Sequence, residues 1–241
     1  MSHDFDQRYW DGVWGGADGA DRVDGADRAD RADGADRAAS MADSPPNPHL
    51  IREVKGLRPG TAIDAGCGAG AEAIWLASTG WQVTAVDIAD EALRRAASRA
   101  AAAGVDDRIA WQRADLSTWR PGFRFDLVTT HYAHPSIPQL DFYERIANWV
   151  APGGTLLIVG HLHHGHHSHS HSPRSFHSHG GHHHDTHPPA EAEVTAEAIT
   201  LRFASKEWEV ATAAEGAREM RGPGSRGATV HDVVFRAVRR D

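Results

Sequence analysis

The feature that most constrains the fold is a short apolar stretch that runs into closely spaced glycines, Ala62-Ile63-Asp64-Ala65-Gly66-Cys67-Gly68-Ala69-Gly70. This pattern predicts a strand end, a tight turn and a helix over 72–78. Glycines adopt backbone angles closed to other residues and leave no Cβ in the way of a ligand. The helix start offers free N–H groups to polar ligand atoms. The stretch is therefore either a plain strand–helix turn or a ligand site in which Asp64 holds a cationic group.

The next apolar run favours the ligand site. It extends from Trp81 to Asp87 and ends in a carboxylate 17 residues after Gly70. An acid at this point of a βαβ unit is placed to accept hydrogen bonds from both hydroxyls of a ribose. The glycine spacing is GxGxG, so a nicotinamide oxidoreductase, whose fingerprint is GxGxxG, lacks its usual turn here.

Together, the two stretches DAGCGAG and VTAVDI resemble the first two motifs of class I S-adenosylmethionine-dependent methyltransferases. The resemblance implies a doubly wound α/β fold with a Rossmann-like sheet of seven strands, the last one antiparallel. It implies that Asp64 positions the amino group of the cofactor and that Asp87 binds its ribose. Ile88 would then lie against the adenine and Asp115 near the adenine amino group. The complete set of cofactor contacts expected from the domain is Asp64, Ala65, Gly66, Cys67, Gly68, Gly70, Asp87, Ile88, Asp115 and Leu116.

Composition argues against nucleic-acid-binding, disulfide-bonded and membrane-spanning classes of protein. The formal net charge of −8 argues against a nucleic-acid partner, because phosphate binding needs clustered Lys and Arg. The single cysteine, Cys67, excludes an internal disulfide and fits a reducing compartment. No apolar run approaches the length of a membrane span, and the N-terminus lacks a signal pattern. These observations predict a soluble cytoplasmic protein with no membrane partner.

An N-terminal arm over residues 1–46 is expected to precede a methyltransferase domain over 47–241. Trp10 and Trp14 would share one face of a helix. The stretch YWDGVW is similar to the N-terminal segment of small-molecule methyltransferases of the thiopurine and tellurite type, which adds both tryptophans to the expected cofactor contacts as a lid. Packing on the core is the alternative, and both can hold. Residues 18–38 repeat Asp every third position with few large apolar residues, which predicts a disordered linker.

The remaining elements follow from periodicity, breakers and caps. A helix is expected after Pro48, and another begins at Asp90 as its N-cap. Pro152-Gly153-Gly154 is expected to end a helix and lead into a strand. The helix that begins at Asp90 is expected to continue over 92–103. The further expected helices are 140–150 and 191–203, and the further expected strands are 61–64, 109–112, 125–130, 155–159, 208–213 and 229–238.

The fourth strand delivers His131 and His134 to the carboxyl edge of the sheet, where open α/β sheets bind their ligands. The two histidines either relay a proton near neutral pH or merely shape the pocket. We treat both as candidate catalytic residues. The loop lacks the (Asn/Asp)-Pro-Pro-(Tyr/Phe) pattern of nucleic-acid amino-methylating enzymes. The predicted reaction is therefore methyl transfer from S-adenosylmethionine to a small molecule.

A histidine-rich insertion over 161–187 holds 13 of the 18 histidines. Neutral imidazoles bind nickel, zinc and copper, so this composition predicts a flexible metal-binding tract. The second hypothesis is therefore a metal-handling protein that uses the methyltransferase core as a scaffold. The candidate ligands are His161, His163, His164, His166, His167, His169, His171, His182, His183 and His184.

Overall fold

The computed structural model describes residues 7–15, 44–162, 194–219 and 229–241. Its helices are α1 (Gln7–Gly15), α3 (Pro48–Val54), α4 (Ala71–Ser78), α5 (Asp90–Ala103), the 3-10 turn η1 (Asp106–Arg108), α6 (Gln139–Ala147) and α7 (Ala196–Arg202). Its strands are β1 (Thr61–Ala65), β2 (Gln82–Asp87), β3 (Ile109–Arg113), β4 (Phe125–His131), β5 (Val150–His161), β6 (Trp208–Glu219) and β7 (Thr229–Arg239).

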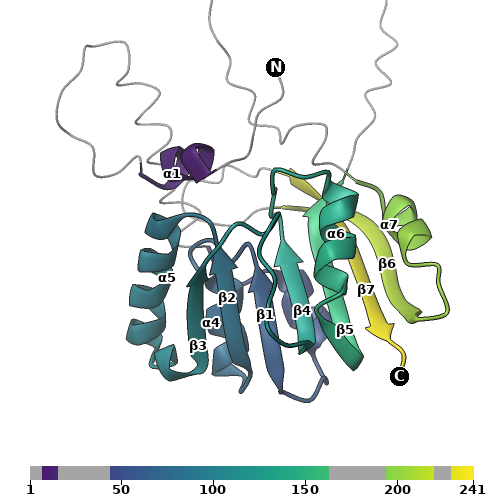
Figure 1. The fold of residues 1–241 in the computed structure, drawn as a ribbon, viewed down its shortest axis with the longest axis horizontal. Helices are drawn as coiled ribbons and strands as arrows, with labels where there is room; N and C mark the ends of the chain where they lie inside the picture. Colours follow the sequence, from purple (N-terminus) through teal and green to yellow (C-terminus); the bar gives the residue numbers. More distant parts are fainter. Residues whose placement is uncertain (1–6, 16–43, 163–193, 220–228) are drawn as a thin grey trace, which may run out of the picture.

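The strands form one seven-stranded sheet in the order β3-β2-β1-β4-β5-β7-β6 (Figure 1). Strands β1 to β5 pair in parallel, whereas β7 is antiparallel to both of its neighbours. The chain order reverses between β1 and β4, which is where doubly wound sheets open a crevice at their carboxyl edge. The predicted fold class, including the antiparallel last strand, is confirmed.

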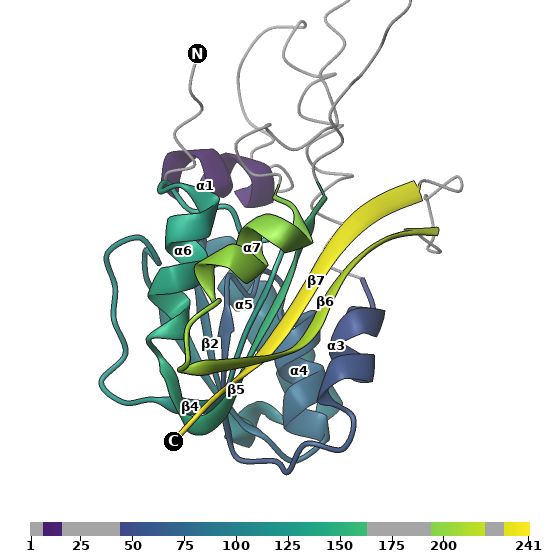
Figure 2. The same cartoon turned by 90° about the vertical axis from the view of Figure 1, so that its right-hand side faces the viewer.

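Helices cover both faces of this sheet (Figure 2). On one face α3, α4 and α5 bury a cluster that includes Leu50, Leu76 and Leu93. On the other face α6 and α7 bury Phe142 and Ile199. The central strands are therefore buried on both sides, as parallel sheets require.

Helix α5 shows how local sequence sets an element. Its alanines have high helix propensity, and Gly104 ends it in a left-handed conformation at φ 67°. The predicted N-cap, Asp90, is wrong, because Ala89 occupies that position and Asp90 is the first helical residue. The backbone N–H of Ala89 instead donates to the carboxylate of Asp87. That side chain therefore fixes the start of the helix from outside it.

Two strands exceed their predicted lengths by more than one residue. Strand β5 already begins at Val150, and its register against β4 shifts over the Pro-Gly-Gly stretch, which forms a bulge rather than a separate turn. Strand β6 continues to Glu219, six residues beyond its predicted end. Most of its side chains are exposed, so it lacks the alternating burial pattern that reveals a strand in a sequence.

The elements that carry the predicted site meet at the carboxyl edge. The turn after β1, the end of β2 and the loop after β4 lie side by side there, because these strands are parallel neighbours. Helix α1 lies over the same edge (Figure 1, purple). None of the helices in the described ranges is long and apolar enough to cross a membrane.

Candidate functional site

The glycine turn is held against the second strand. The N–H groups of Gly66 and Cys67 both donate to the carbonyl of Val86, at 2.8 and 3.0 Å. A methyl group at Gly66 would collide with Ala133 of the loop after β4. Gly70 adopts φ 78° at the start of α4, where a side chain would strike Trp111 and Ala96. The turn therefore needs glycine for close packing as well as for backbone angle.

Asp64, at the end of β1, is 1% exposed. Its Oδ2 has no hydrogen-bond partner among the described residues, although the carboxylate accepts a hydrogen bond from the N–H of Ala73. Burial, followed by the charges of Glu72 and Asp87, raises the pKa of Asp64 well above its ordinary value. An incompletely satisfied buried carboxylate is costly without a partner, so this position is suited to a cationic ligand group.

Asp87, at the end of β2, faces the same turn. Its Oδ2 accepts from the N–H of Gly68 at 2.8 Å, and its Oδ1 accepts from the N–H of Ala89 at 2.9 Å. Burial raises the pKa of Asp87, and these backbone hydrogen bonds partly offset that rise. Each carboxylate oxygen has a second lone pair, so both remain able to accept a hydroxyl.

Glu72 is a third carboxylate at this turn, and we did not single it out from the sequence. It lies in the first turn of α4, two residues after Gly70. Its Oε1 accepts from the N–H of Asn47 at 3.0 Å. Burial raises the pKa of Glu72, while hydrogen bonds from its own N–H and that of Asn47 and the charges of two arginines act against the rise. Its position just after the glycine turn is the sequence feature that could have identified it as a site residue.

Helix α1 places an aromatic side chain on the turn. Trp14 is 3% exposed and clusters with Ala69, Ala89 and Ala92, and Trp10 packs against the same cluster. A Cβ at Gly68 would lie 3.3 Å from the Trp14 ring. Helix α1 therefore both packs on the domain and covers the glycine turn, so the two interpretations of Trp10 and Trp14 are compatible.

The other predicted cofactor residues lie around the same edge. Asp115 caps the backbone after β3, where its Oδ1 accepts from the N–H of Ser117 at 2.8 Å. Leu116 is buried and would lie 3.9 Å from a Cβ at Gly66. Ile88 is partly buried at the end of β2. Cys67 is buried, and burial raises the pKa of its thiol, which suits a space-filling residue rather than a nucleophile.

The candidate catalytic histidines are partly buried, His131 at the end of β4 and His134 in the loop that follows. Neither ring nitrogen of His131 has a hydrogen-bond partner within the described ranges. Burial, followed by the charge of His49, lowers the pKa of His131 to about 3. Burial and His161 lower the pKa of His134 to about 4. Both rings are therefore neutral near pH 7, which suits hydrogen bonding to an acceptor better than storing a proton.

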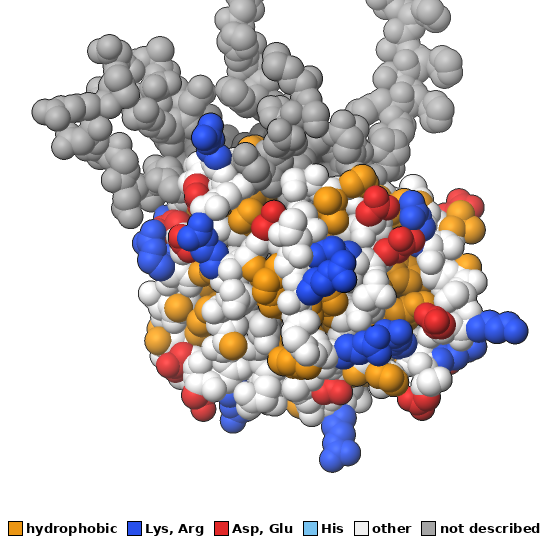
Figure 3. All heavy atoms as spheres, viewed as in Figure 1, with side chains coloured by type: hydrophobic (Ala, Val, Ile, Leu, Met, Phe, Trp, Pro, Cys, Tyr) orange, Lys and Arg blue, Asp and Glu red, His pale blue; other side chains and the backbone are white. Residues whose placement is uncertain are grey.

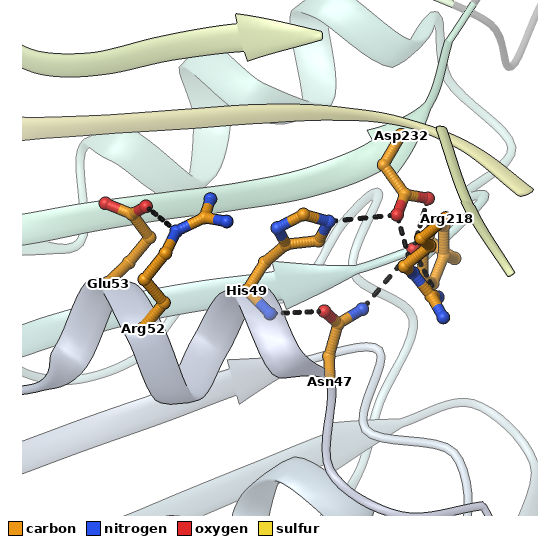
Figure 4. Close-up of polar contacts among 7 residues, drawn as sticks. Asn47, His49, Arg52, Glu53, Arg218 and Asp232 are labelled. Carbon is orange, nitrogen blue, oxygen red and sulfur yellow. Dashed lines mark hydrogen bonds and ion pairs between the residues drawn. The ribbon is translucent and has the colours of Figure 1, made fainter. Parts of the chain in front are cut away.

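Beside them lies a polar cluster, which we call the rim cluster. It consists of Asn47, His49, Arg218 and Asp232, which are labelled in Figure 4, together with Tyr132. Asp232 accepts from the Tyr132 hydroxyl at 2.6 Å, from Arg218 Nε at 2.6 Å and from His49 Nε2 at 3.0 Å. The Tyr132 hydroxyl in turn accepts from Arg218 Nη2 at 3.0 Å and from Asn47 Nδ2 at 3.3 Å.

The rim cluster holds an unusual backbone conformation. Tyr132 has φ 53°, a value that costs free energy in a residue with a side chain. The turn that it makes brings Ala133 against the glycine turn. The cluster therefore fixes the loop that carries both candidate catalytic histidines. The sequence offered no local signal for it, because its members come from distant parts of the chain.

The predicted metal ligands fall almost entirely outside the described residues. His161, at the end of β5, is described, and its ring lies 4.7 Å from that of Tyr132 and 5.4 Å from that of His134. The other nine lie outside these ranges. No group of three or more His, Cys, Asp or Glu side chains in the described part of the chain is arranged to hold a metal ion.

Comparison with known proteins agrees with this geometry. Residues 62–154 match the family described as "Methyltransferase domain". The chain is 35% identical over 108 residues to ribosomal RNA small subunit methyltransferase C of Alcanivorax borkumensis, covering 42% of this chain and 32% of that protein. It is 33% identical over 129 residues to a ubiquinone biosynthesis O-methyltransferase of Xanthomonas campestris, covering 48% and 53%. TehB from Haemophilus influenzae has a similar fold, with a TM-score of 0.59, 14% identity and coverage of 81% and 62%.

The chain carries a class I S-adenosylmethionine-dependent methyltransferase domain. The matched region contains the glycine turn, both following acids and the loop after β4. The chain spans between 32% and 53% of the length of the curated relatives that it matches. Those relatives are named for RNA and for small-molecule methylation, so they do not define the methyl acceptor.

Proposed function

We propose that this protein transfers a methyl group from S-adenosylmethionine to a small-molecule acceptor. The observation that carries the proposal is a buried acid, Asp64, and a partly buried acid, Asp87, around a glycine turn. Asp64 keeps an unpartnered oxygen there, and Asp87 retains free acceptor capacity. The residues fit the cofactor, because its ammonium group needs an anionic partner and its ribose needs an acceptor of two hydroxyls.

In this arrangement the turn residues Ala65 to Gly70 line the methionine part of the cofactor. Asp64 holds the amino group, Asp87 accepts the ribose hydroxyls, and Ile88, Asp115 and Leu116 surround the adenine. Trp10 and Trp14 of α1 exclude water from the turn. When bound, S-adenosylmethionine supplies a methyl group on a positively charged sulfur. The protein then contributes alignment and exclusion of water, which can supply much of the acceleration of such a displacement.

On the acceptor side, His131 and His134 orient the methyl acceptor by hydrogen bonds from neutral rings. An acceptor that is already deprotonated needs no base, which agrees with the lowered pKa of both rings, since a low pKa makes each ring a weak base. A small molecule is favoured over nucleic acid by the net charge of −8. On the face in Figure 3, acidic and basic side chains are interspersed, with no continuous basic surface among the described residues.

The test is a screen of small-molecule acceptors with the purified protein, read out as release of S-adenosylhomocysteine. We expect turnover with at least one small acceptor and none with ribosomal RNA fragments. Asp87→Ala serves as the inactive control. Methylation of RNA alone would overturn the acceptor class, and absence of cofactor binding would overturn the whole proposal.

The metal hypothesis rests on sequence alone. Replacement of residues 161–187 by a Gly/Ser linker should abolish uptake of nickel, zinc or copper at pH 7.5 and leave cofactor binding intact. Equal nickel uptake by the linker variant would contradict it.

A further inference from the structure

We infer that Glu72 is a further cofactor-recognition residue, whose charge makes the site prefer S-adenosylmethionine over its product S-adenosylhomocysteine. The inference rests on the proposed function and deepens it. The two ligands share an ammonium group, a carboxylate and an adenosine, and they differ by the methyl group and the positive charge on sulfur. A site that distinguishes them by charge needs more negative charge than one ammonium group neutralises.

The glycine turn has this excess. Asp64, Glu72 and Asp87 surround it, and none of them forms an ion pair with a lysine or arginine in the described part of the chain. Asp64 is almost fully buried with one oxygen unpartnered, which independently indicates a missing ligand group. The charge of Asp87 is partly offset by two backbone N–H donors, and its remaining lone pairs are assigned to the ribose hydroxyls. Glu72 is therefore the acid left to supply charge beyond that of Asp64.

The negative charge of Glu72 is balanced by positive charges only from a distance, without an ion pair among the described residues. The charged and titratable groups that act on it or share its turn are Asp64 of β1, Cys67 of the turn, Asp87 of β2, Arg99 of α5 and Arg218 of β6. Arg99 donates to the carbonyls of Ala69 and Ser44, at 2.8 and 3.3 Å. Arg218 donates to the rim cluster. Both guanidinium groups are thus directed to other acceptors, and a cationic ligand has no competing ion pair to displace.

Proton release supplies a second signature. Burial first, and neighbouring acids next, raise the pKa of Asp64, and burial raises the pKa of Glu72. Raised values mean that the empty site retains protons to higher pH than free carboxyl groups do. A cationic sulfur favours the ionised acids, so S-adenosylmethionine should release more protons on binding than S-adenosylhomocysteine does. For the same reason the preference should shrink as pH falls.

The experiment is titration calorimetry of wild type and Glu72→Gln with each ligand, in two buffers of different ionisation enthalpy, between pH 6 and 8. Glutamine keeps the size of the side chain and an acceptor for the Asn47 N–H. We expect Glu72→Gln to reduce the affinity ratio of the two ligands about tenfold, as loss of one nearby charge in a partly buried site implies. It should also reduce the difference in proton release. Asp107→Asn, an exposed acid at the opposite edge of the sheet, is the matched charge control and should keep both.

The outcomes separate the two proposals. Binding of neither ligand by wild type would overturn the proposed function. Binding of both ligands with an unchanged ratio in Glu72→Gln would overturn the role of Glu72 alone. Glu72→Asp keeps the charge on a shorter side chain and should retain the preference, which also covers the case in which Glu72→Gln fails to fold. A loss of preference in a folded Glu72→Asp variant would show that shape, not charge, carries the effect.

Discussion

Two aspartates at the carboxyl edge of the sheet are equally buried but differ in their hydrogen-bond partners and in the direction of their pKa shift. Asp64, beside the glycine turn, and Asp232, in the rim cluster, are each 1% exposed. Burial, followed by neighbouring acids, raises the pKa of Asp64. Burial alone would raise the pKa of Asp232 too, but hydrogen bonds from His49 and Tyr132 and the charge of Arg218 lower it.

The difference shows what each region is built for. The donors around Asp232 come from the protein itself, so its negative charge stabilises the folded chain. Asp64 has a single backbone donor and an unpartnered oxygen, so its charge is costly until a ligand arrives. We therefore infer that the rim cluster supports the loop after β4, whereas the glycine turn gives up some stability in favour of ligand binding.

The largest expected effect on the free energy of unfolding is in the rim cluster. Asp232→Ala removes the shared acceptor of three side chains and leaves Arg218 without its ion pair. We expect a loss of about 3 kcal/mol in the free energy of unfolding, as for a broken buried pair. Urea denaturation at pH 7.5 measures it. Asp141→Ala is the matched control, since Asp141 is 53% exposed and pairs only at the surface. Equal urea midpoints for Asp232→Ala and wild type would contradict the claim that the charge of Asp232 stabilises the fold.

The next effect is on the cofactor side and concerns binding. Asp87→Ala should weaken S-adenosylmethionine binding by roughly 1.5–3 kcal/mol for each charge-assisted hydrogen bond lost to the ribose. Titration calorimetry measures it, with a melting curve to establish that the variant is folded. Asp90→Ala removes the same charge three residues later, from a side chain that is 55% exposed, and should bind normally. An unchanged affinity of Asp87→Ala for S-adenosylmethionine would contradict the proposal that Asp87 binds the ribose.

The two regions also differed in how far the sequence could reveal them. One strand–turn–helix–strand unit of 24 residues holds the glycines, Asp64 and Asp87. Their spacing can therefore be recognised in the sequence. In the rim cluster, Tyr132 is 100 residues from Asp232 and 86 from Arg218. Such contacts depend on the register of β5, β7 and β6, which no local pattern specifies.

The errors of detail have different origins, some of them local. The start of α5 was misassigned because Asp90 has the composition of an N-cap, yet Asp87 already bonds the N–H of Ala89 from the preceding strand. The sequence also gives no sign of the neutral state of His131, because its pKa depends on burial in the folded chain and on the charge of His49. Glu72 was overlooked although it stands next to the motif.

A smaller effect tests whether the rim cluster acts through hydrogen bonding. Tyr132→Phe removes one donor to Asp232 and one acceptor of Arg218 and Asn47, which should cost about 1 kcal/mol of stability. Because Asp232 then loses part of the interaction that lowers its pKa, its contribution should be lost at a higher pH on acidification. Acid unfolding followed by circular dichroism measures the shift. Tyr143→Phe also removes a buried hydroxyl but does not touch Asp232, so its acid limb should match wild type.

The smallest expected effect is a gain in stability, whereas the substitutions in the rim cluster should lose stability. It tests the contrast between Asp64 and Asp232 most directly. Asp64→Asn keeps an acceptor for the Ala73 N–H and removes the buried charge. A carboxyl group with a raised pKa in the folded state favours folding at low pH and loses that advantage as pH rises through the folded-state pKa. The ligand-free variant should therefore match wild type at acidic pH and exceed its stability by about 0.5 kcal/mol at pH 8. Urea midpoints across this range measure the difference, and Asp107→Asn should show none. A variant less stable than wild type at pH 8 would mean that Asp64 supports the fold as Asp232 does, and the distinction between the two regions would fail.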